Sequence, residues 1–353
     1  MDRGSALAIL TPPSAVAGAL AVGSGLILLA GASPLVAYKA LIDGAFGSLY
    51  SLSETLVRAH PLLLAGLGVT IAIRCGVWNI GAEGQLYLGA LMATWLGITL
   101  TTWPPALLIP LAIVASFLAG GFWAMIPGVL KAKRGVSEII NTIMMNYVAI
   151  FGVSYLVTGP LQEARRVLPQ SPPIAEVAQL PIIVSGTRLH MGVILALISA
   201  VAVYIILWKT TLGYEIRAVG SNPEAARYGG ISVGRKVVTA MTISGGLAGL
   251  AGMGEILGIH HRLISAFSPG YGYTAIAVAL LGRLHPLGVV LAAILFGILE
   301  VGSGTIQRTA GVPVQVLYII QGLVILFLLL GEFLHRSYIR TALLRLRLRG
   351  VEV

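Results

Sequence analysis

Three polar side chains stand at the entrance to an apolar run: Asn79, Glu83 and Gln85 within "CGVWNIGAEGQLYLGALMATWLG". A carboxylate and two amides can either contact a polar solute or bond backbone groups that a helix break has freed. Gly81 and Gly84 allow the backbone to turn sharply between them. We expect this group to be chiefly architectural, a hydrogen-bonded break that borders a path. Direct contact with a substrate is the second interpretation.

A second set of polar residues lies in "SEIINTIMMNYVAIF", a segment that is otherwise apolar. On an α-helix, Glu138, Asn141, Thr142 and Asn146 fall within one arc of roughly 140°. Because polar groups are costly in lipid, this face must meet protein or water. Two roles stay open for it: hydrogen bonds between helices, or the lining of a substrate path.

No residues have the spacing of a catalytic or metal site. HExxH, GxSxG and CxxC are absent, Cys75 is the only cysteine, and the adjacent His260 and His261 lack a third ligand at helical spacing. None of the five lysines follows a glycine, which excludes a P-loop. We therefore predict that the chain is not an enzyme and binds no metal or cofactor itself. Any ATP and Mg²⁺ that it depends on must be held by another subunit.

The composition indicates an all-α polytopic membrane protein. Of the 353 residues, 57% are apolar and 10% charged, and the mean hydropathy is +0.93. A soluble domain has about 25% charged residues, and a membrane β-barrel would show short alternating strands in place of long apolar runs. In this setting the net charge of +10 is typical of cytoplasmic loops, and we expect no nucleic acid partner.

The apolar runs predict about ten transmembrane helices within a single domain, residues 1–353, since each crossing takes roughly 20 residues. They lie near 14–32, 52–73, 84–101, 104–128, 138–158, 190–208, 237–257, 273–283, 286–304 and 312–331. Residues 32–54 are too polar to span and are expected to lie at the interface. The run 273–283 is too short to cross alone, which suggests a half-helix paired with the next segment.

Charge and pattern give an expected orientation and symmetry. An even number of spans places both termini on one side, and most of the 23 Lys and Arg residues fall there, including those of the tail 333–353, which indicates the cytoplasm. The blocks 52–158 and 237–331 start from opposite sides, and each has an early break, "NIGAEGQ" or "SPGYGYT", as in an inverted repeat. Gly245 and Gly249 have the spacing of close helix packing.

One inner segment, residues 210–236, is long for a loop in such a chain: "TTLGYEIRAVGSNPEAARYGGISVGRK". Ser221 and Glu224 have the spacing of a capping box, and two glycines follow where a short helix would end. The small residues Ala225 and Ala226 would let this helix enter a partner's groove. A plain connector is the alternative, since loops carry function by tendency only.

Four motifs occur in order: "WNIGAEGQLYLGA", "SEIINTIMMNYVA", "GYEIRAVGSNPEAARYGGISVGR" and "SPGYGYTAIAVALLGRLHPLG". With them the chain resembles, from about Ala37 to Glu332, the permease subunits of bacterial ABC importers for simple sugars and nucleosides. It is most similar to the longer permease of nucleoside systems. This group belongs with the branched-chain amino acid and ribose permeases, and its fold is similar to that of the permease of the vitamin B12 importer, a type II importer.

The resemblance implies a location in the bacterial cytoplasmic (inner) membrane and three protein partners: a second homologous permease, an ATPase with tandem nucleotide-binding domains, and an extracytoplasmic substrate-binding lipoprotein. It also implies that the inner segment is the coupling element, with its core at Asn222, Pro223, Glu224, Ala225 and Ala226. It does not distinguish nucleoside from sugar as the substrate, and we favour the nucleoside.

An ion- or proton-coupled secondary transporter with an inverted repeat is the alternative function. Its proton sites would be the acidic residues at membrane depth, which are Glu83, Glu138, Glu255 and Glu300. The long inner segment is the feature that disfavours it.

Overall fold

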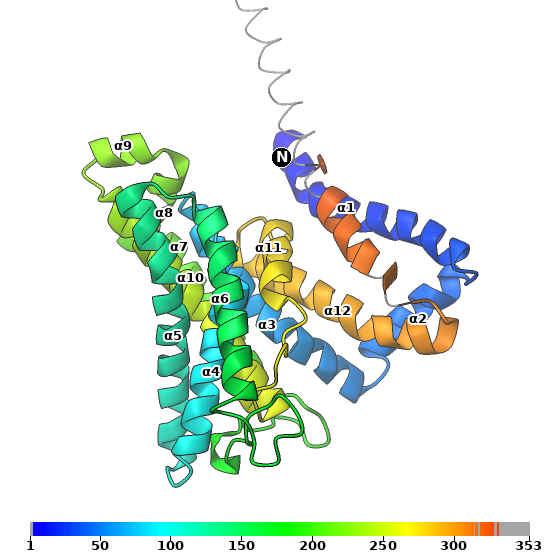
Figure 1. Cartoon of the computed structure of the whole chain (residues 1–353). Helices are drawn as coiled ribbons and strands as arrows, with labels where there is room; N and C mark the ends of the chain where they lie inside the picture. Colours follow the sequence, from blue (N-terminus) through cyan, green and yellow to red (C-terminus); the bar gives the residue numbers. More distant parts are fainter. Residues whose placement is uncertain (1–2, 314, 317, 328–329, 332–353) are drawn as a thin grey trace, which may run out of the picture. The chain divides into compact units, whose positions relative to one another are not determined.

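The computed structural model describes residues 3–313, 315–316, 318–327 and 330–331, and every named element in these ranges is a helix (Figure 1). The elements are α1 (Arg3–Leu29), α2 (Pro34–Phe46), α3 (Leu49–Arg74), α4 (Ala82–Thr99), α5 (Pro105–Arg134), α6 (Glu138–Thr158), η1 (Glu176–Ala178), α7 (Gly192–Lys209), α8 (Thr211–Ser221), α9 (Pro223–Tyr228), α10 (Val233–Glu255), η2 (Ile256–His260), α11 (Tyr271–Leu281) and α12 (Pro286–Ala310). The chain divides into two compact units, residues 52–297 and residues 1–51 with 298–353. The predicted basic tail, 333–353, lies outside the described residues.

Six helices in the described ranges are long and apolar enough to cross a membrane: α3, α5, α6, α7, α10 continued by η2, and α12. A bent pair, Ser14–Leu29 with Pro34–Phe46, makes a seventh if it is one span. The chain is therefore a multi-pass membrane protein. α4 is not among them and carries Glu83 and Gln85 in its first turn. α11 is short, as the sequence predicted, with 11 residues.

Glycines bring the central helices of residues 52–297 into close contact. α10 packs along α4 and α5, which also pack on each other. A Cβ at Gly249 would collide with the backbone oxygen of Ser116, and one at Gly245 would collide with that of Gly120. The predicted close packing at these two glycines is confirmed. Such contacts stabilise helices in lipid through van der Waals packing, because the hydrophobic effect no longer drives their association there.

The other unit has its own core, formed by residues of α1, α2 and the second half of α12 together with residues that follow it. Its buried members include Ile27, Leu41, Leu299, Ile306 and Ile320. The segment 32–54, expected at the interface, contains α2, which turns 116° away from α1. One row of α2 is buried and includes Ala37 and Ala45.

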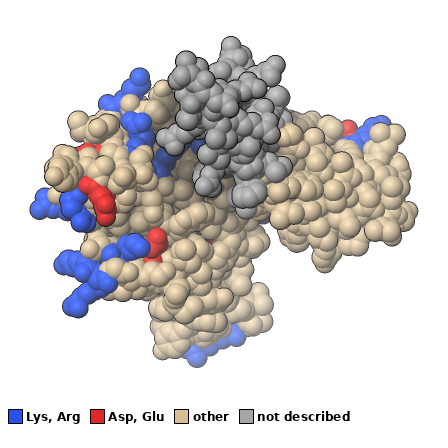
Figure 2. Space-filling model, turned by 90° about the horizontal axis from the view of Figure 1, so that it is seen from above, with Lys and Arg blue, Asp and Glu red and all other residues tan. Residues whose placement is uncertain are grey.

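The helices of residues 52–297 form a bundle whose two ends differ in structure and charge. At one end, here called the α9 end, α5 and α7 end, α6 and α10 begin, and α8 and α9 project (Figure 1). Exposed cations of this end are Lys133, Arg134, Lys209, Arg227 and Arg235, and Figure 2 shows more blue than red side chains on the face seen from above. The loop 159–191 lies at the opposite end, where Ser171 N–H donates to Leu263 O (2.8 Å) and Leu180 N–H to Leu257 O (2.8 Å).

Candidate functional site

The break before α4 is held together by side chains that bond one another and the backbone. Asn79 Nδ2 donates to Gln85 Oε1 (2.8 Å) and to Ser244 Oγ of α10 (2.8 Å). Gln85 Nε2 donates back to Asn79 Oδ1 (2.9 Å), which also accepts the Gly81 N–H (3.0 Å). Asn79, Glu83 and Gln85 are all buried. A buried polar group without a partner costs about 1–3 kcal/mol, so this closed network stabilises the turn.

Glu83 joins the two breaks of the chain. One carboxylate oxygen, Oε2, accepts the N–H of Gly272 in the first turn of α11 (2.7 Å). A Cβ on Gly272 would collide with the backbone of Glu83, so the starts of α4 and α11 meet backbone to backbone. The first N–H groups of a helix have no partner within the helix, and a carboxylate there is stabilised by the helix dipole.

The polar face of α6 divides into residues that are bonded and one that is not. Asn146 Oδ1 accepts the Gly84 N–H (2.8 Å), while its Nδ2 donates to Ile80 O (2.8 Å) and the Tyr273 hydroxyl (3.2 Å). Thr142 Oγ1 donates to Glu138 O (2.7 Å), and the Glu138 carboxylate pairs with Lys131 of α5 (2.8 Å). Asn141 Nδ2 is buried and has no hydrogen-bond partner among the described residues.

The inner segment folds as two helices, α8 and the short α9. The predicted capping box at Ser221 is wrong by one residue: Ser221 ends α8, and Asn222 Oδ1 accepts the N–H groups of Glu224 and Ala225 (3.0 Å each). Pro223 is the cause, because the residue before a proline is held extended and proline suits the first helical position. α9 ends before Gly229, as expected from the glycines.

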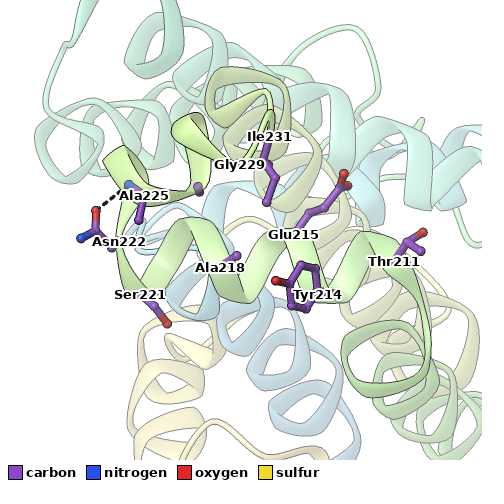
Figure 3. Close-up of a pocket in the computed structure, with 10 residues that line it drawn as sticks. Thr211, Tyr214, Glu215, Ala218, Ser221, Asn222, Ala225, Gly229 and Ile231 are labelled. Carbon is purple, nitrogen blue, oxygen red and sulfur yellow. Dashed lines mark hydrogen bonds between the residues drawn. The ribbon is translucent and has the colours of Figure 1, made fainter.

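A cavity of about 500 Å³ lies between α8 and α9 (Figure 3). Its lining includes Tyr214, Glu215 and Ala218 of α8, and Ile231 points toward α8 from beyond α9. Lys236 of α10 pairs with the carboxylate of Glu215 and so connects α10 to α8.

The two predicted alanines of α9 differ in burial. Ala225 is exposed, whereas Ala226 is 5% exposed and packs against the chain itself. Tyr228 is fully exposed and Tyr214 is 63% exposed. Sequence reasoning missed both tyrosines, although exposed aromatic residues are enriched at the centres of protein interfaces.

The described residues contain no group of three His, Cys, Asp or Glu that could hold a metal. Residues 52–297 contain two candidate sites. One is the buried polar network that joins the start of α4 to the start of α11. The other is α9, a capped and exposed helix beside the cavity.

The chain is similar to several known ABC transporter permeases. The chain is 42% identical over 340 residues to the glucose ABC transporter permease protein TsgB13 of Haloferax volcanii, covering 94% of this chain and 89% of that protein. It is 41% identical over 330 residues to the guanosine ABC transporter permease protein NupP of Bacillus subtilis (90% and 92%). It is 33% identical over 329 residues to the nucleoside ABC transporter permease protein NupB of Lactococcus lactis (91% and 90%).

No solved structure matches the chain. Residues 51–329 match the family described as the permease component of the branched-chain amino acid transport system. The match extends over most of the chain and includes both broken helices and the α8–α9 segment, so the protein belongs to this family of ABC transporter permeases.

Proposed function

We propose that the chain is the permease subunit of an ATP-driven importer and forms the translocation path for a nucleoside, with a simple sugar as the alternative substrate. The observation that supports this most directly is α9, a capped and exposed helix beside a cavity, in a chain of an ABC permease family. Guanosine, nucleosides and glucose are the substrates in the names of three similar permeases. Two of these three names give a nucleoside as the substrate, which favours a nucleoside for this chain.

The proposal includes an arrangement in the membrane. About ten segments enter the bilayer, each taking roughly 20 residues where it crosses fully, and the fold is of the type of the vitamin B12 importer permease. The repeat halves 52–158 and 237–331 belong to one transmembrane domain with both termini in the cytoplasm. The cations of the α9 end support this orientation, since cytoplasmic loops are rich in Lys and Arg.

The proposed partners are a second homologous permease, an ATPase with tandem nucleotide-binding domains that holds ATP and Mg²⁺, and an extracytoplasmic lipoprotein that delivers the substrate. The α8–α9 segment would be the docking element for the ATPase, with Asn222, Pro223, Glu224, Ala225 and Ala226 at its core. In α9 the Asn222 cap bonds the first amides, so the helix is able to move as a rigid body.

The candidate lining of the path is the polar face of α6: Glu138, Asn141, Thr142 and Asn146. The contacts support different roles within it. Asn146 bonds Gly84 and Ile80 at the break before α4 and Tyr273 of α11, whereas the buried Asn141 Nδ2 has no hydrogen-bond partner in the described part of the chain, and a solute that entered the path would supply the missing acceptor. We therefore assign solute contact to Asn141 and a bridging role to Asn146.

Gradient-driven transport by this chain alone is the competing function. Among its candidate proton sites, Glu83 accepts the Gly272 amide, Glu138 pairs with Lys131 and Glu255 Oε2 lies 3.5 Å from His260 Nε2. Purified alone in vesicles, the chain should hydrolyse no ATP and should show no uptake under a proton or sodium gradient. With its ATPase, second permease and binding protein, it should take up substrate only when ATP is supplied. Gradient-driven uptake by the isolated chain would contradict the proposed function.

Adding bulk to the exposed face of α9 tests the docking role. Ala225→Trp should abolish co-purification with the ATPase and leave thermal unfolding of the permease unchanged, because the Ala225 side chain is exposed. Ser185→Trp, at an exposed position of the opposite end, is the matched control and should bind the ATPase normally. Normal binding and coupled hydrolysis in Ala225→Trp would show that α9 is not the docking element.

The two asparagines of α6 should respond differently to truncation. Asn146→Ala leaves the buried Gly84 N–H without its acceptor and should lower the free energy of unfolding by about 1–3 kcal/mol. Asn141→Ala should leave stability unchanged and lower uptake. Thermal unfolding of the purified complex and uptake in proteoliposomes, corrected for protein amount, separate these effects. Wild-type uptake by Asn141→Ala would rule out its contact with the solute.

A further inference from the structure

The end of α11 nearest α9 is held by an arginine from another helix. Arg74, the last residue of α3, donates from Nε to Leu284 O (2.9 Å) and from Nη2 to Arg283 O (3.3 Å). These carbonyls belong to the turn between α11 and α12, where both residues have left-handed backbone conformations, with φ values of 55° and 53°. The guanidinium group thus bonds two adjacent carbonyls of this turn from a fixed position, and its charge also favours the negative end of the helix dipole.

The same guanidinium group packs against an aromatic cluster formed by Tyr204, Trp208 and His285. The Arg74 Cζ lies 5.4 Å from the centroid of the Trp208 ring, in cation–π range. His285 lies beside Trp208 (4.9 Å between centroids) and Tyr204 (5.8 Å). Burial, and to a lesser extent the Arg74 cation, lower the pKa of His285, so a neutral imidazole packs in this cluster.

Trp208 also contacts the docking segment. Arg217 of α8 places its Cζ 5.9 Å from the centroid of the same indole ring. Its Nε is buried without a hydrogen-bond partner among the described residues. Trp208, near the end of α7, is therefore approached by one cation from α3 and one from α8.

A backbone contact joins α8 to α3 as well. A Cβ at Gly220 of α8 would collide with the backbone oxygen of Arg74, and Gly220 Cα lies 3.3 Å from the position that a Cβ on Gly76 would occupy. The end of α8 therefore rests directly on the residues that begin the break before α4. A displacement of α8 cannot leave Arg74 and this break unmoved, because closely packed groups transmit strain.

α11 is consequently held at both ends by the segment that runs from α3 to α4. Glu83 bonds the Gly272 amide at its start, and Arg74 bonds the carbonyls beyond its end. α11 is the broken helix of the second repeat block, and its Tyr273 contacts Asn146 on the candidate lining of the path.

From these contacts we infer that Arg74 is a positioning residue, which transmits movement of the α8–α9 segment to the half-helix α11 and so couples ATP hydrolysis to the translocation path. The inference rests on the proposed function, in which α8–α9 docks the ATPase. Arg74 contacts neither substrate nor nucleotide in this scheme; it acts through the turn between α11 and α12.

Arg74→Lys is the first test, because lysine keeps the charge and loses the planar fork that reaches two carbonyls. In the complete transporter in proteoliposomes, the number of substrate molecules imported per ATP hydrolysed should fall about tenfold, within the usual range for coupling between sites. Co-purification with the ATPase should be unchanged. Arg217→Gln removes the contact from α8 to Trp208 without touching α11, and it should lower the same ratio.

Lys209→Gln is the matched control, since Lys209 is an exposed cation next to Trp208. It should keep the wild-type ratio. A wild-type ratio in Arg74→Lys would overturn the inference, and so would loss of ATPase binding in this variant, because a positioning role requires an assembled complex. If the wild-type chain itself failed to bind the ATPase, the proposed function would fail and the inference with it, and the wild-type sample alone reveals that outcome.

Discussion

The structure depends on one constraint: a backbone amide freed by a helix break inside a membrane bundle must find its partner within the protein. Two such breaks lie within residues 52–297, one before α4 and one before α11. Each is satisfied by residues from elsewhere in the chain. Asn146 of α6 bonds Gly84 N–H at the first, and Glu83 of α4 bonds Gly272 N–H at the second. The two breaks therefore form one hydrogen-bonded unit.

Close packing around the two breaks supports these hydrogen bonds. Gly272 has no side chain to separate the starts of α4 and α11. The glycines of α10 let this helix approach α4 closely enough for Ser244 to accept a hydrogen bond from Asn79. Beyond the other end of α11, Arg74 donates to the carbonyl oxygens of Leu284 and Arg283 in the turn that precedes α12. The 11-residue helix α11 is therefore bonded by Glu83 of α4 at its start and followed by a turn that Arg74 of α3 bonds. Arg74 in turn lies against Gly220 of α8, where an added Cβ would collide with the Arg74 backbone oxygen.

The sequence predicted those features of the fold that depend on residues close together in the chain. The short α11, the end of α9 at its glycines and the close packing at Gly245 and Gly249 all follow from residue types and spacing. Membership of an ABC permease family followed from four linked motifs.

The remaining features depend on contacts between distant residues. Nothing local pairs Glu83 with Gly272, which follows it by 189 positions, or Arg74 with Leu284. The choice of Asn222 over Ser221 as the cap of α9 was decided by Pro223, whose effect on the preceding residue outweighed the capping-box spacing. The difference between Ala225 and Ala226 required knowledge of which side of α9 faces the chain.

Hydrogen–deuterium exchange of the peptide that spans residues 268–275 tests the central claim, that the Glu83 carboxylate closes the break before α11. In the wild-type protein the Gly272 amide should exchange slowly, and Glu83→Ala should speed its exchange because the acceptor is gone. Glu83→Gln keeps an acceptor oxygen and should retain most of the protection, while a peptide covering α9 should be unaffected in both variants. Equal exchange of residues 268–275 in the wild type and in Glu83→Ala would contradict the account.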